Sequence, residues 1–152
     1  MCPINTVGRP LISIVMPVFN AECYVANAIE SILKQTYDHF ELLIVDDASS
    51  DDSYNIIQSF TDPRISLFKH EKNLGYLKAV NFLFSQSKGD FITFQDADDW
   101  SAPQRLCAQV KAFDHDPRLM FCGTQCIYSK KGTELRRSAF PSTYSEVVFQ
   151  LE

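Results

Sequence analysis

The stretch LISIVMPVF, residues 11–19, decides the fold because nine residues run without a charge and stop at polar Asn20. Such a near-continuous apolar run is typical of a strand buried on both faces of a sheet. The next segment, AECYVANAIESILKQ (residues 21–35), carries its larger apolar residues at helical spacing, so a helix should follow the strand. Asn20 stands between the two and is the predicted N-cap of that helix.

The alternation of buried strand and amphipathic helix continues along the chain. Further strands are predicted at residues 40–47, 64–70, 91–96 and 119–129. Helices are predicted between them, the second with Ser49 and Asp52 as a capping box and the fourth beginning at Pro103. Strands that alternate with helices predict an α/β fold with a mainly parallel open sheet and helices on both faces.

Composition narrows the classes of partner. The chain has 152 residues, a net charge of −5 and a pI near 5.1, which favours one domain and speaks against nucleic acid as a partner. No apolar run is long enough for a membrane span, and the first residues lack the pattern of a secretory signal. The five cysteines are odd in number, so we expect free thiols and a cytoplasmic location, which includes the inner face of a membrane. The three histidines are isolated in the sequence and are expected at the surface or in loops.

Polar clusters follow three of the predicted strands. They are residues 20–22 after the first strand, Asp46 and Asp47 after the second, and the acids of QDADD (residues 95–99) after the fourth. The carboxyl ends of parallel strands share one edge of a sheet, where ligands of open α/β folds bind. We therefore expect the three clusters to converge on a binding site.

Two interpretations stay open for each acidic cluster. Asp46 and Asp47 suit either the N-terminal end of a helix or the recognition of a base or ribose, although no G-x-G-x-x-G is present to indicate a dinucleotide fold. Asp96, Asp98 and Asp99 form either a solvated acidic loop or a site for Mg²⁺ or Mn²⁺. In an extended segment, a D-x-D sequence directs two carboxylates to the same side.

Several stretches, taken in order, resemble the nucleotide-binding part of a family 2 glycosyltransferase with the type A fold. They are VMPVFN (residues 15–20), AIESILKQTYDHFELLIVDDASSDDS (28–53), NLGYLKAVN (73–81), GDFITFQDADDW (89–100) and PQRLCAQVKAF (103–113). Enzymes of this family transfer a sugar, with inversion, from a nucleotide diphosphate to an acceptor hydroxyl. The resemblance implies a UDP-sugar donor, a saccharide or lipid-linked acceptor, and a role in cell-surface polysaccharide biosynthesis.

The resemblance also assigns site residues. It implies that residues of the first loop border the base and ribose, that the acid pair lies near the base, and that a later segment covers the nucleotide. These residues are Pro17, Val18, Phe19 and Glu22, then Asp46 and Asp47, then Gly75 and Lys78. Asp96, Ala97 and Asp98 match the metal motif, with Asp96 and Asp98 as ligands of Mn²⁺ or Mg²⁺ and Asp98 as the first choice for contact with the ion. Asp99 is expected to orient the loop or to touch the donor.

Two positions depart from the family pattern. Val80 stands where many relatives carry Arg, and no acid of this chain matches the family's catalytic base, which we expect beyond Glu152. We therefore expect part of a longer protein: an extension at 1–10, a nucleotide-sugar-binding domain at 11–129, and a truncated start of the acceptor side at 130–152. Such a fragment should be inactive alone and prone to self-association.

Two alternatives to a transferase stay open from the sequence. A phospho-receiver signalling domain also carries an acid pair after one strand, an aspartate after another, and Mg²⁺ among them. A non-catalytic nucleotide-binding fragment would keep the fold without the reaction.

Overall fold

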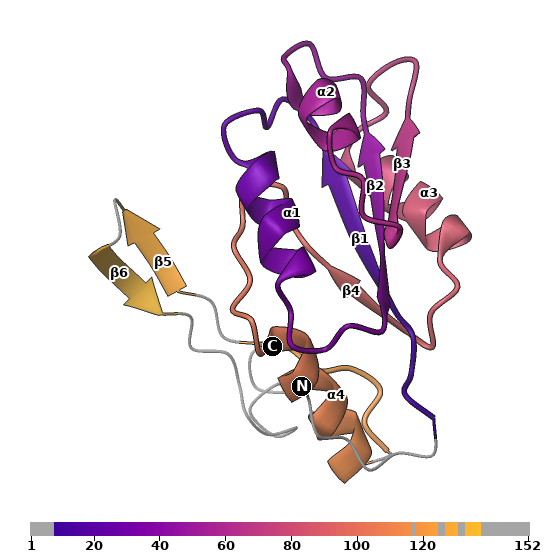
Figure 1. Ribbon diagram of the computed structural model, residues 1–152, viewed down its shortest axis with the longest axis vertical. Coiled ribbons are helices and arrows are strands. Elements are labelled where there is room, and N and C mark those ends of the chain that lie inside the picture. Colours follow the sequence, from indigo (N-terminus) through magenta and orange to yellow (C-terminus); the bar gives the residue numbers. More distant parts are fainter. Residues whose placement is uncertain (1–7, 117, 125–126, 131–132, 138–152) are drawn as a thin grey trace, which may run out of the picture. The chain divides into compact units, whose positions relative to one another are not determined.

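The computed structural model describes residues 8–116, 118–124, 127–130 and 133–137 (Figure 1). The chain divides into two compact units, Met1–Cys107 and Ala108–Glu152, and each is described by itself. The first unit holds strands β1 (Ile12–Val18), β2 (Phe40–Asp46), β3 (Ile65–Lys69) and β4 (Phe91–Phe94), with helices α1 (Val25–Leu33), α2 (Ser53–Gln58) and α3 (Tyr76–Gln86). Helix α4 spans Arg105–His115. It was predicted to start at Pro103 and begins two residues later.

The four strands of the first unit form one parallel sheet in the order β3-β2-β1-β4. This arrangement confirms the predicted α/β fold. The register pairs Val18 with Asp46, and Val15 with Phe94. Strand β1 is therefore central, and the ends of β2 and β4 flank its own end.

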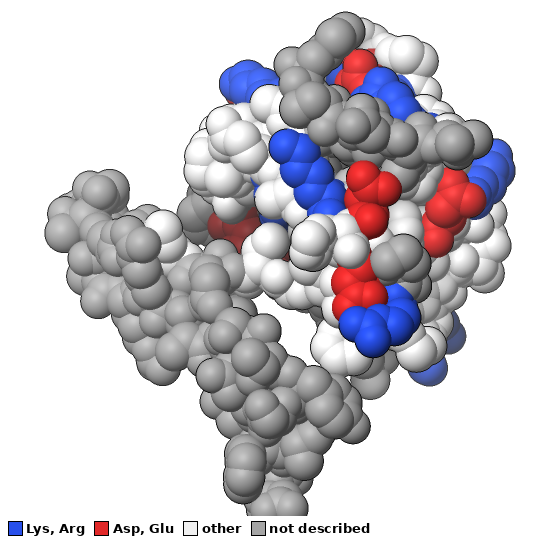
Figure 2. All heavy atoms as spheres, turned by 90° about the horizontal axis from the view of Figure 1, so that it is seen from below, with Lys and Arg blue, Asp and Glu red and all other residues white. Residues whose placement is uncertain are grey.

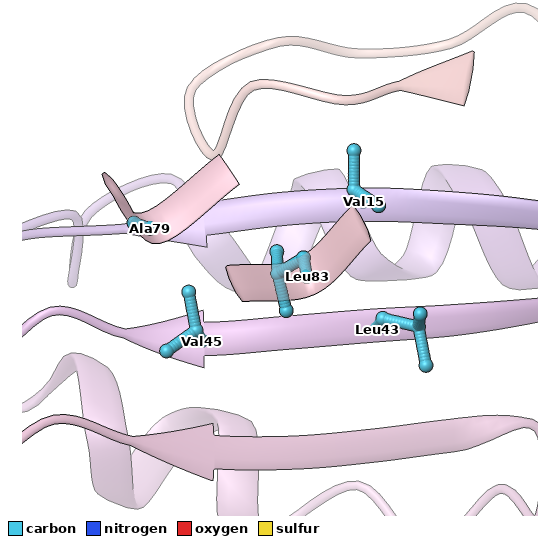
Figure 3. Packing of buried hydrophobic residues seen from close by; sticks show 5 residues of the cluster. All are labelled: Val15, Leu43, Val45, Ala79 and Leu83. Atoms are coloured by element: carbon cyan, nitrogen blue, oxygen red, sulfur yellow. The ribbon is translucent and has the colours of Figure 1, made fainter. Parts of the chain in front are cut away.

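Helices cover both faces of the sheet, as predicted (Figure 1). The apolar stripe of α1 is buried, because its side chains at helical spacing, Val25, Ala28, Ile29 and Ile32, are each at most 1% exposed. On the other face, α3 places Ala79 and Leu83 against alternate residues of β1 and β2. Figure 3 shows this cluster, in which Leu83 lies over Val15, Leu43 and Val45. Burial of this kind contributes ~1.5–3 kcal/mol for each large aliphatic side chain.

Both predicted N-caps are wrong. Helix α1 begins at Val25, with Tyr24 at its N-cap, and α2 follows Asp52; neither helix has a hydrogen bond from a capping side chain. The side chains of Asn20 and Ser49 accept hydrogen bonds from each other's loops instead. A side chain that can cap its own helix can equally satisfy a neighbouring backbone, and here the neighbouring loop wins.

The predicted fifth strand is also wrong in extent and in partner. Residues 119–124 form no strand, and β5 (Ile127–Lys130) pairs antiparallel with β6 (Thr133–Arg137) in a separate two-stranded sheet. The two strands are close in the sequence, which favours their pairing, since closing a small loop costs less entropy than pairing with a strand far away along the chain.

Three further observations bear on the expectations from composition. None of the helices in the described ranges is long and apolar enough to cross a membrane. Cys107 is disulfide-bonded, so the expectation of free thiols is wrong for this residue, whereas Cys23 and Cys122 are free. The face seen from below, away from the strand ends that carry the acids, intersperses acidic and basic side chains (Figure 2).

Candidate functional site

The three polar clusters meet at the carboxyl edge of the sheet, as predicted. Strand β1 lies between β2 and β4, and the three strands point the same way (Figure 1). The Asp47 amide donates to the Val18 carbonyl at 2.8 Å, and the Gln95 amide donates to the Val15 carbonyl at 3.1 Å. The ends of β2 and β4 are thus fastened to opposite sides of β1, which brings the acid pair and the D-x-D loop to one edge.

Asp46 ends β2 with a carboxylate that is fully buried. Its Oδ2 accepts the Ser49 amide at 3.3 Å, while its Oδ1 has no hydrogen-bond partner among the described residues. A buried polar atom without a partner costs ~1–3 kcal/mol, and more when charged. Such an atom is normally satisfied by an ordered water or by a ligand group that can donate to it.

The carboxylate of Asp47, the next residue, is hydrogen-bonded within the protein. Its side chain is 4% exposed and accepts the Gly75 amide at 2.8 Å and the Leu74 amide at 3.0 Å. The third partner is His70, whose Nδ1 lies 2.6 Å from Oδ1. Burial alone would raise the pKa of Asp47, but these hydrogen bonds together hold it below its ordinary value. Asp47 therefore ties the segment before α3 to the end of β2.

The D-x-D loop is folded by a buried glutamine that the sequence did not single out. Gln95 is 3% exposed, and its Nε2 donates to the carbonyls of Asp96 at 3.1 Å and Asp99 at 2.9 Å. Its Oε1 accepts the Ser101 hydroxyl at 2.6 Å. With its backbone held in this way, the loop buries Ala97 and leaves the side chains of its acids exposed.

Negative charge is concentrated in this loop. Partial desolvation of the Asp99 carboxylate, followed by the charges of Asp96 and Asp98, raises the pKa of Asp99. The Tyr76 hydroxyl at the start of α3 donates to Asp96 Oδ1 at 3.4 Å, and burial together with the Asp96 charge raises the pKa of this tyrosine. A divalent cation would relieve the repulsion among the acids.

The donor set suits a hard cation that brings ligands of its own. The exposed groups of the loop are carboxylate oxygens, which Mg²⁺ and Mn²⁺ prefer. Across the described part of the chain, no three His, Cys, Asp or Glu side chains gather closely enough to hold a metal alone. Asp96 and Asp98 could therefore hold such an ion only together with water or phosphate oxygens, which is the usual arrangement for Mg²⁺.

The other candidates from the sequence take varied positions at this edge. Phe19 is 51% exposed beyond β1, whereas Val18 is buried and offers only its backbone. Gly75 precedes α3 with a φ of 87°, a conformation that favours glycine, and Lys78 is exposed in the first turn of that helix. Val80 is 5% exposed, so the core explains an apolar residue at this position.

An open pocket of about 400 Å³ lies at the ends of β2 and β3, lined by Ala48, Ser49, Lys69, His70 and Glu71. The Lys69 ammonium lies 3.9 Å from the centre of the Tyr54 ring. His70 lies in a loop, directly after β3, as expected, but its side chain is only 12% exposed and pairs with Asp47. No spacing in the sequence links these two residues, because they meet only across neighbouring strands.

Comparison with known proteins gives one family. The model of "Glycosyl transferase family 2" matches residues 13–151 of this chain. A curated relative from Escherichia coli, a UDP-Glc:alpha-D-GlcNAc-diphosphoundecaprenol beta-1,3-glucosyltransferase, is 44% identical over 100 residues, which are 66% of this chain and 40% of that protein. The chain spans about half or less of the length of the first curated relatives it matches.

Solved structures give the same fold. The structure of Staphylococcus aureus TarS in complex with UDP-GlcNAc matches 68% of this chain and 31% of that chain, with a TM-score of 0.65 and 28% identity. The mannosyltransferase PcManGT from Pyrobaculum calidifontis, in complex with GDP-Man and Mn²⁺, matches 70% of this chain and 33% of that chain, with a TM-score of 0.65 and 25% identity.

Proposed function

Because the chain belongs to glycosyl transferase family 2, we propose that it forms the donor-binding part of an enzyme that transfers a sugar, with inversion, from a nucleotide diphosphate to an acceptor hydroxyl. The observation that carries this proposal is the placement of its acids. Two exposed carboxylates, of Asp96 and Asp98, follow β4, and buried Asp46, whose Oδ1 has no partner among the described residues, ends β2 on the other side of β1.

A UDP-sugar is the proposed donor. Two proteins similar to this chain support this choice. The name of the E. coli relative includes UDP-Glc, and the TarS structure is in complex with UDP-GlcNAc. In this proposal Pro17, Val18 and Phe19 border the base and ribose, and the acid pair lies near the base. Gly75 and Lys78 belong to the segment that covers the nucleotide.

Asp96 and Asp98 are the residues proposed to hold Mn²⁺ or Mg²⁺ with the diphosphate. The support is their exposed oxygen ligands and the presence of Mn²⁺ in a mannosyltransferase of similar fold. Held by Asp96 and Asp98, a divalent ion would supply Lewis-acid stabilisation of the charge that develops on the leaving diphosphate. The chain's own part is to hold the two carboxylates on one loop, which Gln95 folds.

The proposed reaction is a single displacement at the anomeric carbon. The acceptor oxygen forms a bond to that carbon while the bond to the diphosphate breaks, and the electron pair of that bond leaves with the diphosphate. The proton of the acceptor hydroxyl passes to a general base, for which no residue of this chain is assigned. The proposed acceptor is a saccharide or a lipid-linked saccharide in cell-surface polysaccharide biosynthesis, and the named acceptor of the E. coli relative supports this choice.

Calorimetric titration of the chain with UDP and GDP, each with and without Mn²⁺, tests the proposal. We expect UDP to bind more tightly with Mn²⁺ than without it. The Asp98→Asn variant should weaken this metal-dependent binding at least about tenfold, because it removes a carboxylate ligand. Asp114→Asn, which makes the same change at an exposed position of α4, should leave the affinity unchanged.

Two results would contradict the proposal. One is a wild-type chain that binds neither nucleotide in the presence of Mn²⁺, and the other is an equal affinity of the Asp98→Asn variant and wild type. Tighter binding of GDP than of UDP would correct the donor but keep the class of enzyme.

A further inference from the structure

We propose that Glu22 and Asp51 are positioning residues that lock the loop after β1 to the loop after β2. In doing so they set the slot for the nucleoside end of the donor. This inference rests on the proposed function. It differs from the prediction for Glu22 from the sequence, in which this side chain borders the donor itself.

The lock is reciprocal between the two loops. The Glu22 amide donates to Asp51 Oδ2 at 3.0 Å, and the Asp52 amide donates to Glu22 Oε2 at 2.9 Å. The other oxygen of Asp51, Oδ1, accepts the Ser53 hydroxyl at 2.6 Å and the Ser53 amide at 3.0 Å. Each carboxylate thus serves a backbone amide of the opposite loop, and a charged acceptor makes the stronger kind of hydrogen bond.

The residues on either side of Glu22 and Asp51 extend the lock. The Asn20 amide donates to the Ser49 hydroxyl at 3.0 Å, and the Ala21 amide donates to the Ser53 hydroxyl at 2.8 Å. In return, the Ser50 amide donates to Asn20 Oδ1 at 2.8 Å. Three consecutive amides of the first loop, those of residues 20–22, are therefore all satisfied by side chains of the second loop and of the first residue of α2. We name this set of contacts the cross-loop clasp.

The clasp holds two residues in a backbone conformation that residues other than glycine rarely adopt. Asn20 has a φ of 51° and Ala48 has a φ of 61°, both in the left-handed region. Asparagine tolerates this region, but for alanine the left-handed backbone costs free energy. The second loop therefore needs contacts that hold it in place. The clasp provides these contacts one residue after Ala48.

A direct path leads from the clasp to Asp46. The hydroxyl of Ser49 accepts the Asn20 amide, while the backbone amide of the same serine donates to Asp46 Oδ2. A shift of the second loop would therefore turn the Asp46 carboxylate, whose Oδ1 has no partner among the described residues. It would also displace Ala48 and Ser49 in the wall of the pocket. The D-x-D loop after β4 takes no part in these hydrogen bonds.

Two substitutions at Glu22 separate positioning from direct contact. Glu22→Ala removes the acceptor of the Asp52 amide, whereas Glu22→Gln keeps one carbonyl oxygen that can accept it. Loss of this one hydrogen bond to a charged acceptor should weaken UDP binding in the presence of Mn²⁺ about fivefold to tenfold in Glu22→Ala. Glu22→Gln should stay within about twofold of wild type, because an amide oxygen satisfies the same donor.

The affinity for pyrophosphate in the presence of Mn²⁺ separates positioning from a general loss of structure. A general loss of structure would lower this affinity, whereas a loss of positioning at the nucleoside end would not. This ligand lacks the nucleoside, so its affinity should be the same in wild type and both Glu22 variants. Ser49→Ala is a second and milder variant, which removes only the acceptor of the Asn20 amide. It should weaken UDP about twofold to fivefold and also leave pyrophosphate unchanged.

Three results would overturn the clasp as a positioning device. The first is an equal loss of UDP affinity in Glu22→Gln and Glu22→Ala, which would mean that the charge meets the donor directly. The second is an unchanged UDP affinity in Glu22→Ala. The third is a parallel loss of affinity for UDP and for pyrophosphate. A wild-type chain that binds no nucleotide would instead overturn the proposed function, so the two failures are distinguishable.

Discussion

Replacement of Asp47 by Asn should cost this chain a large share of its stability. The Asp47 carboxylate accepts the amides of Leu74 and Gly75 and contacts the His70 ring, all at a position that is 4% exposed. The Asn side chain has a single acceptor oxygen, so its NH₂ group would face at least one buried donor. A hydrogen bond to a charged group is worth ~1.5–3 kcal/mol, so the loss of one or two predicts a decrease of about 2–4 kcal/mol in the free energy of unfolding.

Urea unfolding at pH 7 measures this loss, and Glu71→Gln is the matched control. Glu71 is the exposed neighbour of His70, so the same acid-to-amide change there should shift stability by no more than ~0.5 kcal/mol. If the two variants unfold at the same urea concentration with equal slopes, the tie between β2 and the segment before α3 contributes nothing measurable.

The pH dependence gives an independent check of the same residue. The pKa of Asp47 is lowered in the folded protein from its ordinary value of 3.8. A carboxyl with a lowered folded pKa contributes stability that is fully present above the unfolded pKa and is lost as the pH falls through the folded pKa. The difference between wild type and Asp47→Asn should therefore narrow below about pH 4. An equal difference at pH 3 and pH 7 would refute a role for the charge.

Two further changes test the packing and the electrostatics of the sheet. Gly89→Ala would place a Cβ within 2.5–2.8 Å of three backbone atoms, so we expect a loss of about 1–3 kcal/mol in urea unfolding, whereas Gly123→Ala, with no atom within 4 Å, should cost far less. The hydrogen bond from Arg64 lowers the pKa of Asp62 to about 2, which would be worth up to ~2.4 kcal/mol. The pair is about a quarter exposed, so Asp62→Asn should cost about 1 kcal/mol at pH 7, and this difference should vanish as the pH falls through 2.

The main sheet could be predicted from the sequence because its signal is local. Strands β1 and β2 are buried on both faces, so each reads as an apolar run, and the helix between them carries its own stripe. The convergence of the acids followed from topology alone, since parallel strands end at one edge.

The loop contacts could not be predicted because they are not local. Asn20 and Ser49 are residue types that favour N-cap positions. Instead, their side chains accept hydrogen bonds from each other's loops, although the two residues are 29 positions apart. His70 and Asp47 are 23 residues apart and meet only because β2 and β3 are neighbours. The predicted fifth strand failed for a related reason. An apolar run indicates a strand but not its partner, and here a nearby segment pairs with Ile127–Lys130.

The structure also separates two acids that the sequence treats as one pair. Asp47 has all its acceptor capacity turned inward, toward the amides before α3 and the His70 ring. Asp46 is buried to the same degree but keeps Oδ1 without a partner among the described residues, while its other oxygen is oriented by Ser49. A donor group that reached Oδ1 would satisfy it without breaking an internal bond, whereas contact with Asp47 would have to displace one. Because Asp46 is fully buried, a ligand group reaches Oδ1 only if the loop after β2 moves. The prediction of base recognition therefore falls more naturally on Asp46, and Asp47 acts on the site by holding the segment that leads into α3.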